Sequence, residues 1–170
     1  MGIIKAIGAA AAIVKATEEV TKKLNQKRTV LIQVYNHTDK TLRIRSRDHS
    51  SGDFAEPPSA RIPPRSVDIF GSQDRAWSVM TGAVGSITYG IEGEDTTVTV
   101  RWSNPFFGKN RGSATASGSG ARNYEVTNIM GAGLDAQARY EVLPRVEWPR
   151  SVSRGSGSVT PETDVPLRVK

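Results

Sequence analysis

The chain has 170 residues, a formal net charge of +6 and no cysteine. The absence of cysteine excludes a disulfide framework and a thiolate metal site, and the excess of Lys and Arg favours anionic partners such as acidic lipid, nucleic acid or sulfated glycan. No run of about 18 uncharged apolar residues occurs in the sequence, which excludes a conventional transmembrane helix.

The first 25 residues predict an amphipathic helix, because alanine, lysine and glutamate dominate and apolar residues recur at helical spacing. From Gly2 to Leu24 this helix would be about 35 Å long, against about 30 Å for the hydrocarbon core of a bilayer. Lys5 and Lys15 make it too charged for an ordinary membrane anchor. It is therefore either a surface helix or a segment that lies on a membrane or lines a pore. The side chains that would insert are Ile3, Ile4, Ile7, Ile13, Val14 and Val20.

Two targeting signals compete for the same residues. Ala6 to Val14 resemble the apolar core of a signal peptide, but Lys15 follows at once and the amphipathic pattern continues. Gly2 lacks the Ser or Thr at position 6 that N-myristoylation requires. We therefore interpret the segment as an amphipathic helix of the mature protein.

After Leu24 the pattern changes to short alternating segments, separated by turn residues about every ten positions. The predicted strands are 29–35, 41–48, 66–70, 86–91, 96–102, 124–130 and 137–143, with a weaker candidate at 112–119. We expect the first two to form a hairpin, and residues 50–65, with their four prolines, to form a long loop. This pattern predicts a mainly β protein, an antiparallel β-sandwich or barrel with an N-terminal α-helix.

The composition divides the chain into three parts. Residues 1–26 form the predicted helix, residues 27–146 the β-sandwich domain, and residues 147–170 a flexible basic tail. The tail is rich in Ser, Gly, Pro and Arg and has no hydrophobic period, as is typical of disordered segments.

No catalytic or metal-binding pattern is present in the sequence. His37 and His49 fall in a predicted turn and loop, without partners at metal-ligand spacing. Nucleophile-elbow, P-loop and zinc-protease motifs are absent. We therefore predict a protein that is not an enzyme and takes no cofactor or metal. Asn36-His37-Thr38 matches the N-glycosylation sequon, and we interpret this match as chance.

An arginine ladder is the first candidate binding surface. Arg43, Arg45 and Arg47 alternate with other residues, which in a regular strand places three guanidinium groups on one face about 7 Å apart. Guanidinium groups bind phosphate or sulfate in a bidentate manner. The alternative is an ordinary solvated sheet face. Nucleic acid is not an expected partner, because no RNP-type motif with interleaved aromatics accompanies the charge.

A cluster of aromatic residues beside cations is the second candidate surface. Trp102, Phe106 and Phe107 are followed by Lys109 and Arg111 at a predicted loop. Aromatic rings and cations at a loop tip suit a membrane interface, where rings lie at the depth of the headgroups and cations meet phosphate. The alternative is that Trp102 and one phenylalanine close the core.

Taken in order, these elements resemble the actinoporins, pore-forming cytolysins of sea anemones with relatives in other lineages. The match is carried by Thr81-Gly82-Ala83-Val84 and by Ser103-Asn104-Pro105-Phe106, and more weakly by Ser51-Gly52 and Asn128-Ile129-Met130. Fungal fruit-body lectins resemble the same family in fold but lack its N-terminal helix.

The resemblance implies a secreted, soluble monomer that binds sphingomyelin-rich membranes through its sandwich loops. Its N-terminal helix would then detach and line an oligomeric pore with other copies. The implied phosphocholine pocket corresponds here to Ser51, Val84, Ser103 and Pro105. The family's aromatic loop is replaced by a sequence that contains Phe106, Phe107, Lys109 and Arg111, so we add these residues to the lipid-headgroup site and expect anionic lipid as a second possible ligand.

Two other functions remain open at this point. One is a lectin-like sandwich that binds lipid or carbohydrate without forming pores. The other is a structural or nucleic-acid-associated assembly protein, with the helix as an oligomer contact and the basic tail as an arm.

Overall fold

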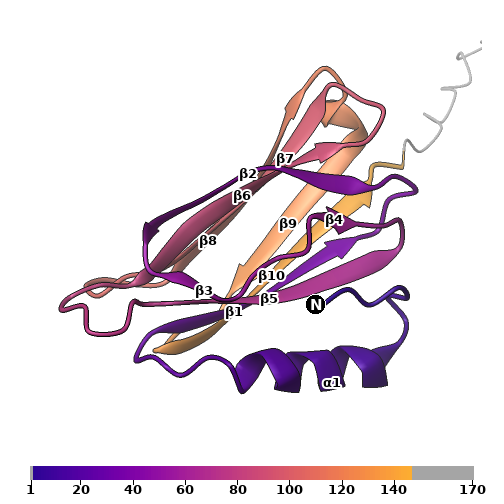
Figure 1. Cartoon of the computed structure of the whole chain (residues 1–170). Helices are drawn as coiled ribbons and strands as arrows, with labels where there is room; N and C mark the ends of the chain where they lie inside the picture. The colour runs from indigo at the N-terminus through magenta and orange to yellow at the C-terminus, as the bar shows by residue number, and fades with distance from the viewer. Residues whose placement is uncertain (1, 147–170) are drawn as a thin grey trace, which may run out of the picture.

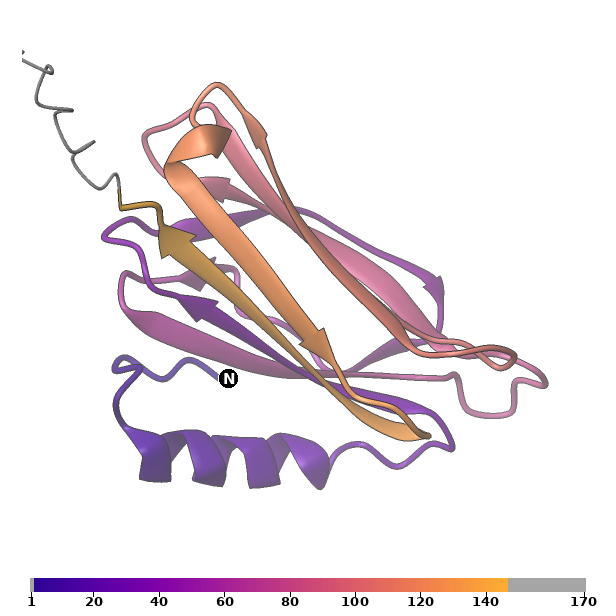
Figure 2. The same cartoon turned by 180° about the vertical axis from the view of Figure 1, so that it is seen from behind.

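The computed structural model describes residues 2–146, which form two five-stranded sheets packed face to face with a helix on the outside (Figure 1, Figure 2). The first sheet has the strand order β3-β5-β1-β10-β9 and the second has the order β4-β2-β6-β7-β8. The predicted β-sandwich with an N-terminal helix is therefore confirmed. The predicted tail, residues 147–170, lies outside the described residues.

The elements have the following bounds. They are α1 (Ala10–Thr21), β1 (Thr29–Asn36), β2 (Leu42–Ser51), β3 (Asp53–Glu56), β4 (Arg61–Ile62), β5 (Ser66–Gln73), β6 (Ala83–Ile91), β7 (Thr96–Asn104), β8 (Arg111–Gly118), the 3₁₀ helix η1 (Ala121–Asn123), β9 (Tyr124–Met130) and β10 (Asp135–Pro144). The segment expected to be a long loop thus contains two short strands, β3 and β4. Apart from β1 and β10, which run parallel, the paired strands are antiparallel.

The predicted hairpin of the first two strands is wrong, because β1 and β2 belong to different sheets. Asn36 sets the path between them. Its Nδ2 donates to the carbonyl oxygens of Lys40, Ile62 and Pro63 at 2.7, 3.1 and 2.9 Å, and its Oδ1 accepts from Thr38. The Asn36 side chain is fully buried, so the sequon asparagine serves the turn.

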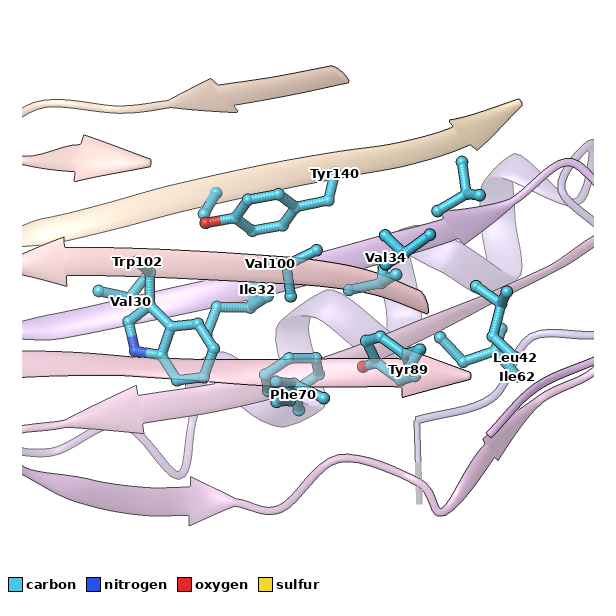
Figure 3. Close-up of a cluster of buried hydrophobic side chains, with 14 of the residues drawn as sticks. Val30, Ile32, Val34, Leu42, Ile62, Phe70, Tyr89, Val100, Trp102 and Tyr140 are labelled. Carbon is cyan, nitrogen blue, oxygen red and sulfur yellow. The ribbon is translucent and has the colours of Figure 1, made fainter. Parts of the chain in front are cut away.

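The main core lies between the two sheets, where Trp102, Phe70, Tyr89 and Tyr140 gather among aliphatic side chains from both sheets (Figure 3). Each fully buried large apolar side chain contributes about 1.5–3 kcal/mol relative to an exposed one. The Tyr140 hydroxyl donates to the Arg101 carbonyl oxygen at 2.5 Å and so connects the two sheets.

The N-terminal helix is shorter than predicted, because the first residues pair with a strand. Ile4 and Val67 exchange two backbone hydrogen bonds at 2.8 and 3.0 Å, and the Ile69 amide donates to the Gly2 carbonyl at 3.1 Å. Because β3 covers β5 only at residues 71–73, the edge of β5 around Val67 and Ile69 would otherwise be open. The β-branched isoleucines favour this extended pairing. Only glycine fits at position 2, since a Cβ there would lie 2.0 Å from the Ile69 carbonyl oxygen.

A second apolar cluster attaches α1 to the outer face of the first sheet (Figure 1). Val20 of α1 is buried against β1 and β5 side chains, and the partly buried side chains around it are Ile4, Ile7, Ile13, Ala16 and Leu24. Ile3 packs against the main core instead, and Val14 is 57% exposed. Most of the side chains predicted to insert into a membrane therefore cover the sandwich in this state. This cover also explains why β1 is apolar on both faces, with a burial pattern that is almost continuous.

A buried carboxylate in β5 gives the fold a pH dependence. The Asp68 side chain is fully buried, and its two oxygens accept hydrogen bonds from the Ser59 amide at 2.8 Å and the Ser59 hydroxyl at 3.0 Å. Removal from water penalises the charged form, and this burial raises the pKa of Asp68 to about 6.

We predict that Asp68→Asn removes a pH-dependent loss of stability. Between about pH 4 and pH 6 the folded protein holds the Asp68 proton more tightly than the unfolded chain does, so the free energy of unfolding falls as the pH rises through this window. Relative to the Asn variant, the free energy of unfolding of the natural protein should fall by up to about 3 kcal/mol between pH 4 and pH 7. Urea unfolding of both proteins at four pH values measures this difference. A difference that stays constant across the window would show that Asp68 does not titrate in it.

Candidate functional site

Four connections meet at one end of the sandwich, on the left in Figure 1 and on the right in Figure 2. They are residues 22–28, 74–82, 105–110 and 131–134, which we call the loop end. The exposed large apolar side chains of the loop end are Trp77, Val79, Met80, Phe106, Phe107 and Leu134. Trp77 is fully exposed and Phe107 is 72% exposed, which is unusual for side chains of this size.

The 74–82 loop is the part of this surface that sequence reasoning missed. Trp77 and Met80 have φ angles of 63° and 62°, a left-handed conformation that bulky residues rarely adopt. The loop is fixed at both ends, because the Asp74 amide donates to the Arg28 carbonyl at 3.0 Å and the Gly82 amide donates to the Ser51 hydroxyl at 3.0 Å. The exposed Trp77 side chain therefore belongs to a loop whose two ends are anchored to the sandwich.

The buried side chain of Asn104 joins three of the four connections. Its Nδ2 donates to the carbonyl oxygens of Thr29 and Leu134 at 3.1 and 2.6 Å, and its Oδ1 accepts from Arg28 Nη1 at 3.2 Å. Arg28 Nη2 also donates to the Phe106 carbonyl at 2.8 Å, and the guanidinium lies 5.2 Å from the centre of the Phe106 ring. One buried amide and one guanidinium thus connect the loops of this end.

The predicted headgroup residues lie on two neighbouring parts of this end. Ser51, Val84, Ser103 and Arg111 are direct register partners across β2, β6, β7 and β8, so they form one row on the outer face of the second sheet. All but Ser51 line a hollow of about 470 Å³ that also includes Arg101. The remaining predicted residues, Pro105, Phe106, Phe107 and Lys109, belong to the adjoining 105–110 loop. Sequence reasoning did not identify Arg101.

Two parts of the predicted surfaces are wrong. Trp102 is buried, with 1% of its surface exposed, because it faces inward from β7 and contacts Phe54 and Phe70. It therefore closes the core, as the alternative interpretation held, and takes no part in the exposed aromatic cluster.

The arginine ladder is interrupted by an irregularity in β2. Arg43 pairs with Gly90 and Arg47 pairs with Ile87, with a register shift between Ile44 and Ser46. Gly90 and Ile87 are three residues apart in β6 and therefore lie on opposite faces of the sheet. Their partners Arg43 and Arg47 consequently lie on opposite faces as well. The extra residue, Arg45, lies over Gly90 on the outer face. The three arginines therefore do not share one face.

Two further hollows adjoin Arg28 at the loop end. One of about 450 Å³ is lined by Lys27, Arg28, Asp74, Ser78, Val79, Met80, Thr81, Phe106 and Leu134. The other, of about 510 Å³, lies between the 105–110 and 131–134 loops and is lined in part by Arg28, Lys109, Met130 and Leu134. The two hollows share Arg28 and Leu134, so the fixed guanidinium borders both.

Within residues 2–146, no group of three or more His, Asp or Glu side chains is placed to hold a metal ion. Burial lowers the pKa of His49, which packs edge-on against Phe54 and Trp102 and shares a 3.0 Å hydrogen bond with the Ser72 hydroxyl. This histidine therefore joins the two sheets. The described part of the chain also holds no helix long and apolar enough to cross a membrane.

The comparisons with known proteins show the fold. No family model matches the chain, and no curated protein matches its sequence. Among solved structures, the lipid binding protein Nakanori superposes with a TM-score of 0.69 at 17% identity, over 78% of each chain. RahU protein, solved in complex with a TRIS molecule, superposes with a TM-score of 0.56 at 14% identity, over 72% of this chain and 99% of its own.

We predict that Asn104→Ala loosens the loop end and destabilises the whole sandwich. The change removes the hydrogen bonds to the Thr29 and Leu134 carbonyls and the one from Arg28, of which the bond to Thr29 is buried and the other two are partly buried. A buried polar group left unpaired costs about 1–3 kcal/mol, and the partly buried groups cost less. Urea unfolding should show a loss of about 2–4 kcal/mol in the free energy of unfolding.

Asn110→Ala is the matched control for this prediction. Its Nδ2 donates to the Gly131 and Gly133 carbonyls at 3.0 and 2.8 Å nearer the surface, where water can replace the side chain. We expect a loss of about 1 kcal/mol or less. Equal losses in the two variants would contradict the central role of Asn104.

Proposed function

We propose that this protein binds lipid membranes through its loop end, and that its N-terminal segment then leaves the sandwich and lines an oligomeric pore. The observation that carries the proposal is the set of exposed apolar side chains on anchored loops, with Trp77 and Phe107 the most prominent. The shared fold with Nakanori, a lipid binding protein, supports lipid as the partner.

The chemistry of the loop end suits an interface with lipid. Transfer of one large apolar side chain from water to hydrocarbon contributes about 1.5–3 kcal/mol, so insertion of Trp77 and Phe107 accounts for substantial affinity. Lys27, Lys109 and Arg111 lie beside these residues in the chain or in the fold and add about 1 kcal/mol each on an anionic surface. Binding to sphingomyelin alone would lack this second contribution.

Pore formation follows from the N-terminal segment by a conformational change. The twelve residues of α1 span only about 18 Å, which is too short for a bilayer, whereas a continuous helix over residues 2–24 would span about 35 Å. Insertion therefore requires residues 2–9 to leave β5 and become helical. Lys5 and Lys15 oppose insertion of a single helix unless they face water, and a ring of copies with a wet lumen provides that water. We place the protein outside the producing cell as a secreted monomer before this step.

A lipid-binding module that forms no pore is the second candidate function. It is favoured by the backbone pairing of residues 2–4 with β5, which fixes the N-terminal segment on the sandwich. The two functions share the loop end and differ only in whether this pairing opens.

We predict that Trp77→Ser and Phe107→Ser each weaken binding to vesicles about 10-fold or more, because each removes an inserting side chain. Val146→Ser is the matched control, since Val146 is 70% exposed and follows β10, the strand that runs from the 131–134 loop to the opposite end of the sandwich. Sedimentation with vesicles of phosphatidylcholine and phosphatidylserine measures the affinity. If the three variants behave alike, the loop end is not the docking surface.

We predict that a disulfide between Ile4→Cys and Val67→Cys blocks dye release from vesicles but leaves vesicle binding intact. Cα atoms of such a hydrogen-bonded antiparallel pair lie about 5.5 Å apart, within the range for a disulfide. The natural chain has no cysteine, so the engineered bridge has no competitor.

The reduced form of the same variant is the control and should recover dye release. Release by the oxidised form would show that the N-terminal segment need not leave β5. Absence of release from the natural protein on both sphingomyelin and anionic vesicles would favour the lipid-binding module.

A further inference from the structure

We infer that the hollow bordered by Arg28, Thr81 and Leu134 binds one anionic phospholipid, with the headgroup phosphate on Arg28 and the start of an acyl chain against Val79, Met80 and Leu134. This inference rests on the proposed membrane binding and names the class of lipid and the residues that select it. The site is separate from the predicted row of Ser51, Val84 and Ser103 on the second sheet.

Arg28 is a fixed and partly buried cation that lacks a counter-ion. Its guanidinium donates to two neutral oxygens, Asn104 Oδ1 and the Phe106 carbonyl. Among the described residues no carboxylate forms an ion pair with it. Taking a charge out of water is unfavourable unless an opposite charge accompanies it, so a phosphate oxygen at this position would be strongly favoured.

Thr81, which also lines this hollow, carries a second polar group without a partner among residues 2–146. The Thr81 hydroxyl oxygen is buried and has no hydrogen-bond partner in the described part of the chain. A hydroxyl can donate to a phosphate oxygen, as a serine or threonine does in many anion sites. Arg28 and Thr81 come from different loops, and both line the hollow.

The remaining walls suit the apolar part of a lipid. Val79, Met80, Phe106 and Leu134 line the hollow, whose volume of about 450 Å³ lies within the usual range for small-molecule sites. Trp77 belongs to the same loop as Val79 and Met80. When Trp77 enters the membrane, the hollow comes to lie at the depth of the headgroups, so a lipid can occupy it without leaving its leaflet.

The same geometry disfavours a choline headgroup. A quaternary ammonium group is normally held on the faces of aromatic rings. The aromatic residue in this hollow is Phe106, and the Arg28 guanidinium already lies over its ring at 5.2 Å. Asp74 is the carboxylate in the hollow, where its Oδ1 accepts from the Arg28 amide at 3.4 Å, and Lys27 lines the same hollow.

The test uses the full chain and two soluble lipids, dihexanoyl phosphatidylserine and dihexanoyl phosphatidylcholine, with inorganic phosphate as a third probe. Both lipids offer a phosphate to Arg28, but the quaternary ammonium of phosphatidylcholine finds no free aromatic face among the described residues that line the hollow, whereas the extra carboxylate of phosphatidylserine suits a site that Lys27 also lines. We therefore expect phosphatidylserine to bind at least about 10-fold more tightly than phosphatidylcholine. Calorimetric titration below the micelle concentration of each lipid measures the affinities. Inorganic phosphate that competes as well as the lipid would identify a plain anion site and overturn the lipid assignment.

Arg28→Gln should lower the affinity for phosphatidylserine about 10-fold or more, whereas Arg122→Gln, which removes the same charge from η1, should change it less than about 2-fold. Because Arg28→Gln also removes contacts to Asn104 and Phe106, Thr81→Val is the second variant, and it should weaken binding about 10-fold without touching that network. Unchanged affinity in Thr81→Val, or equal losses in the two arginine variants, overturns the site.

Measurements of vesicle binding distinguish failure of this phospholipid site from failure of the proposed membrane binding. If the natural protein binds vesicles and the Arg28 and Arg122 variants bind them equally well, membrane binding stands and the phospholipid site is wrong. If the natural protein binds neither phosphatidylcholine vesicles nor vesicles with added phosphatidylserine, the proposed function fails, and the site fails with it.

Discussion

The loop end depends on the buried side-chain amide of Asn104. Its donors and its acceptor satisfy groups from the start of β1, from Arg28 before it and from the 131–134 loop. Without this amide, residues 28–29 and the 131–134 loop, which are distant in sequence, would present polar groups with lost partners to one another, which is unfavourable in a buried position. Because Arg28 is held by the same network, the network also fixes the direction of a cation and the base of the Phe106 loop.

This rigid base explains why exposed apolar side chains are tolerated at the loop end. Large apolar residues on mobile loops would collapse onto the nearest core, but the 74–82 loop is fixed at both ends and holds Trp77 in a left-handed conformation. Such a conformation costs of order 1–3 kcal/mol per residue and persists only where the surroundings impose it. An anchored apolar surface is what a membrane-docking site requires, because little ordering remains to be done on binding.

The N-terminal segment is constrained in a different way. Residues 2–4 occupy an edge of β5 that β3 leaves open, and α1 covers the apolar outer face of the same sheet. Removal of the segment would expose Val67 and Ile69 together with their backbone groups, an unfavourable state in water. The segment therefore has two roles: it completes the sandwich in the state described here, and it is the proposed inserting element.

The sequence predicted the features that depend on local pattern. Strict alternation in Thr96–Trp102 identified β7, and Val84 and Ser103, from the two motifs that carry the resemblance, lie opposite each other on neighbouring strands. The features that failed depend on tertiary contacts. The pattern of the isoleucine-rich N-terminus predicts a helix, but its first residues pair with the open edge of β5 instead. In β2, the single extra residue at Arg45 places Arg47 on the other face of the sheet.

Exposure was the least predictable property of the candidate site. Trp102 lies inside the sandwich, whereas Trp77 lies outside it. The difference arises from strand membership: Trp102 occupies an inward position of β7, whereas Trp77 has no strand partner at all. The absence of alternation around Trp77, Val79 and Met80 was the signal that could have identified an exposed apolar loop. Arg28 gave no local signal, because its importance comes from Asn104, 76 positions away.

Hydrogen exchange of the full chain, with and without vesicles of phosphatidylcholine and phosphatidylserine, tests the central claim most directly. If the loop end is the docking surface, backbone amides of residues 74–81 and 105–109 should exchange more slowly on vesicles, whereas those of β9 and of the η1 region should not change. Protection on the outer face of either sheet, with the loop end unchanged, would contradict the account.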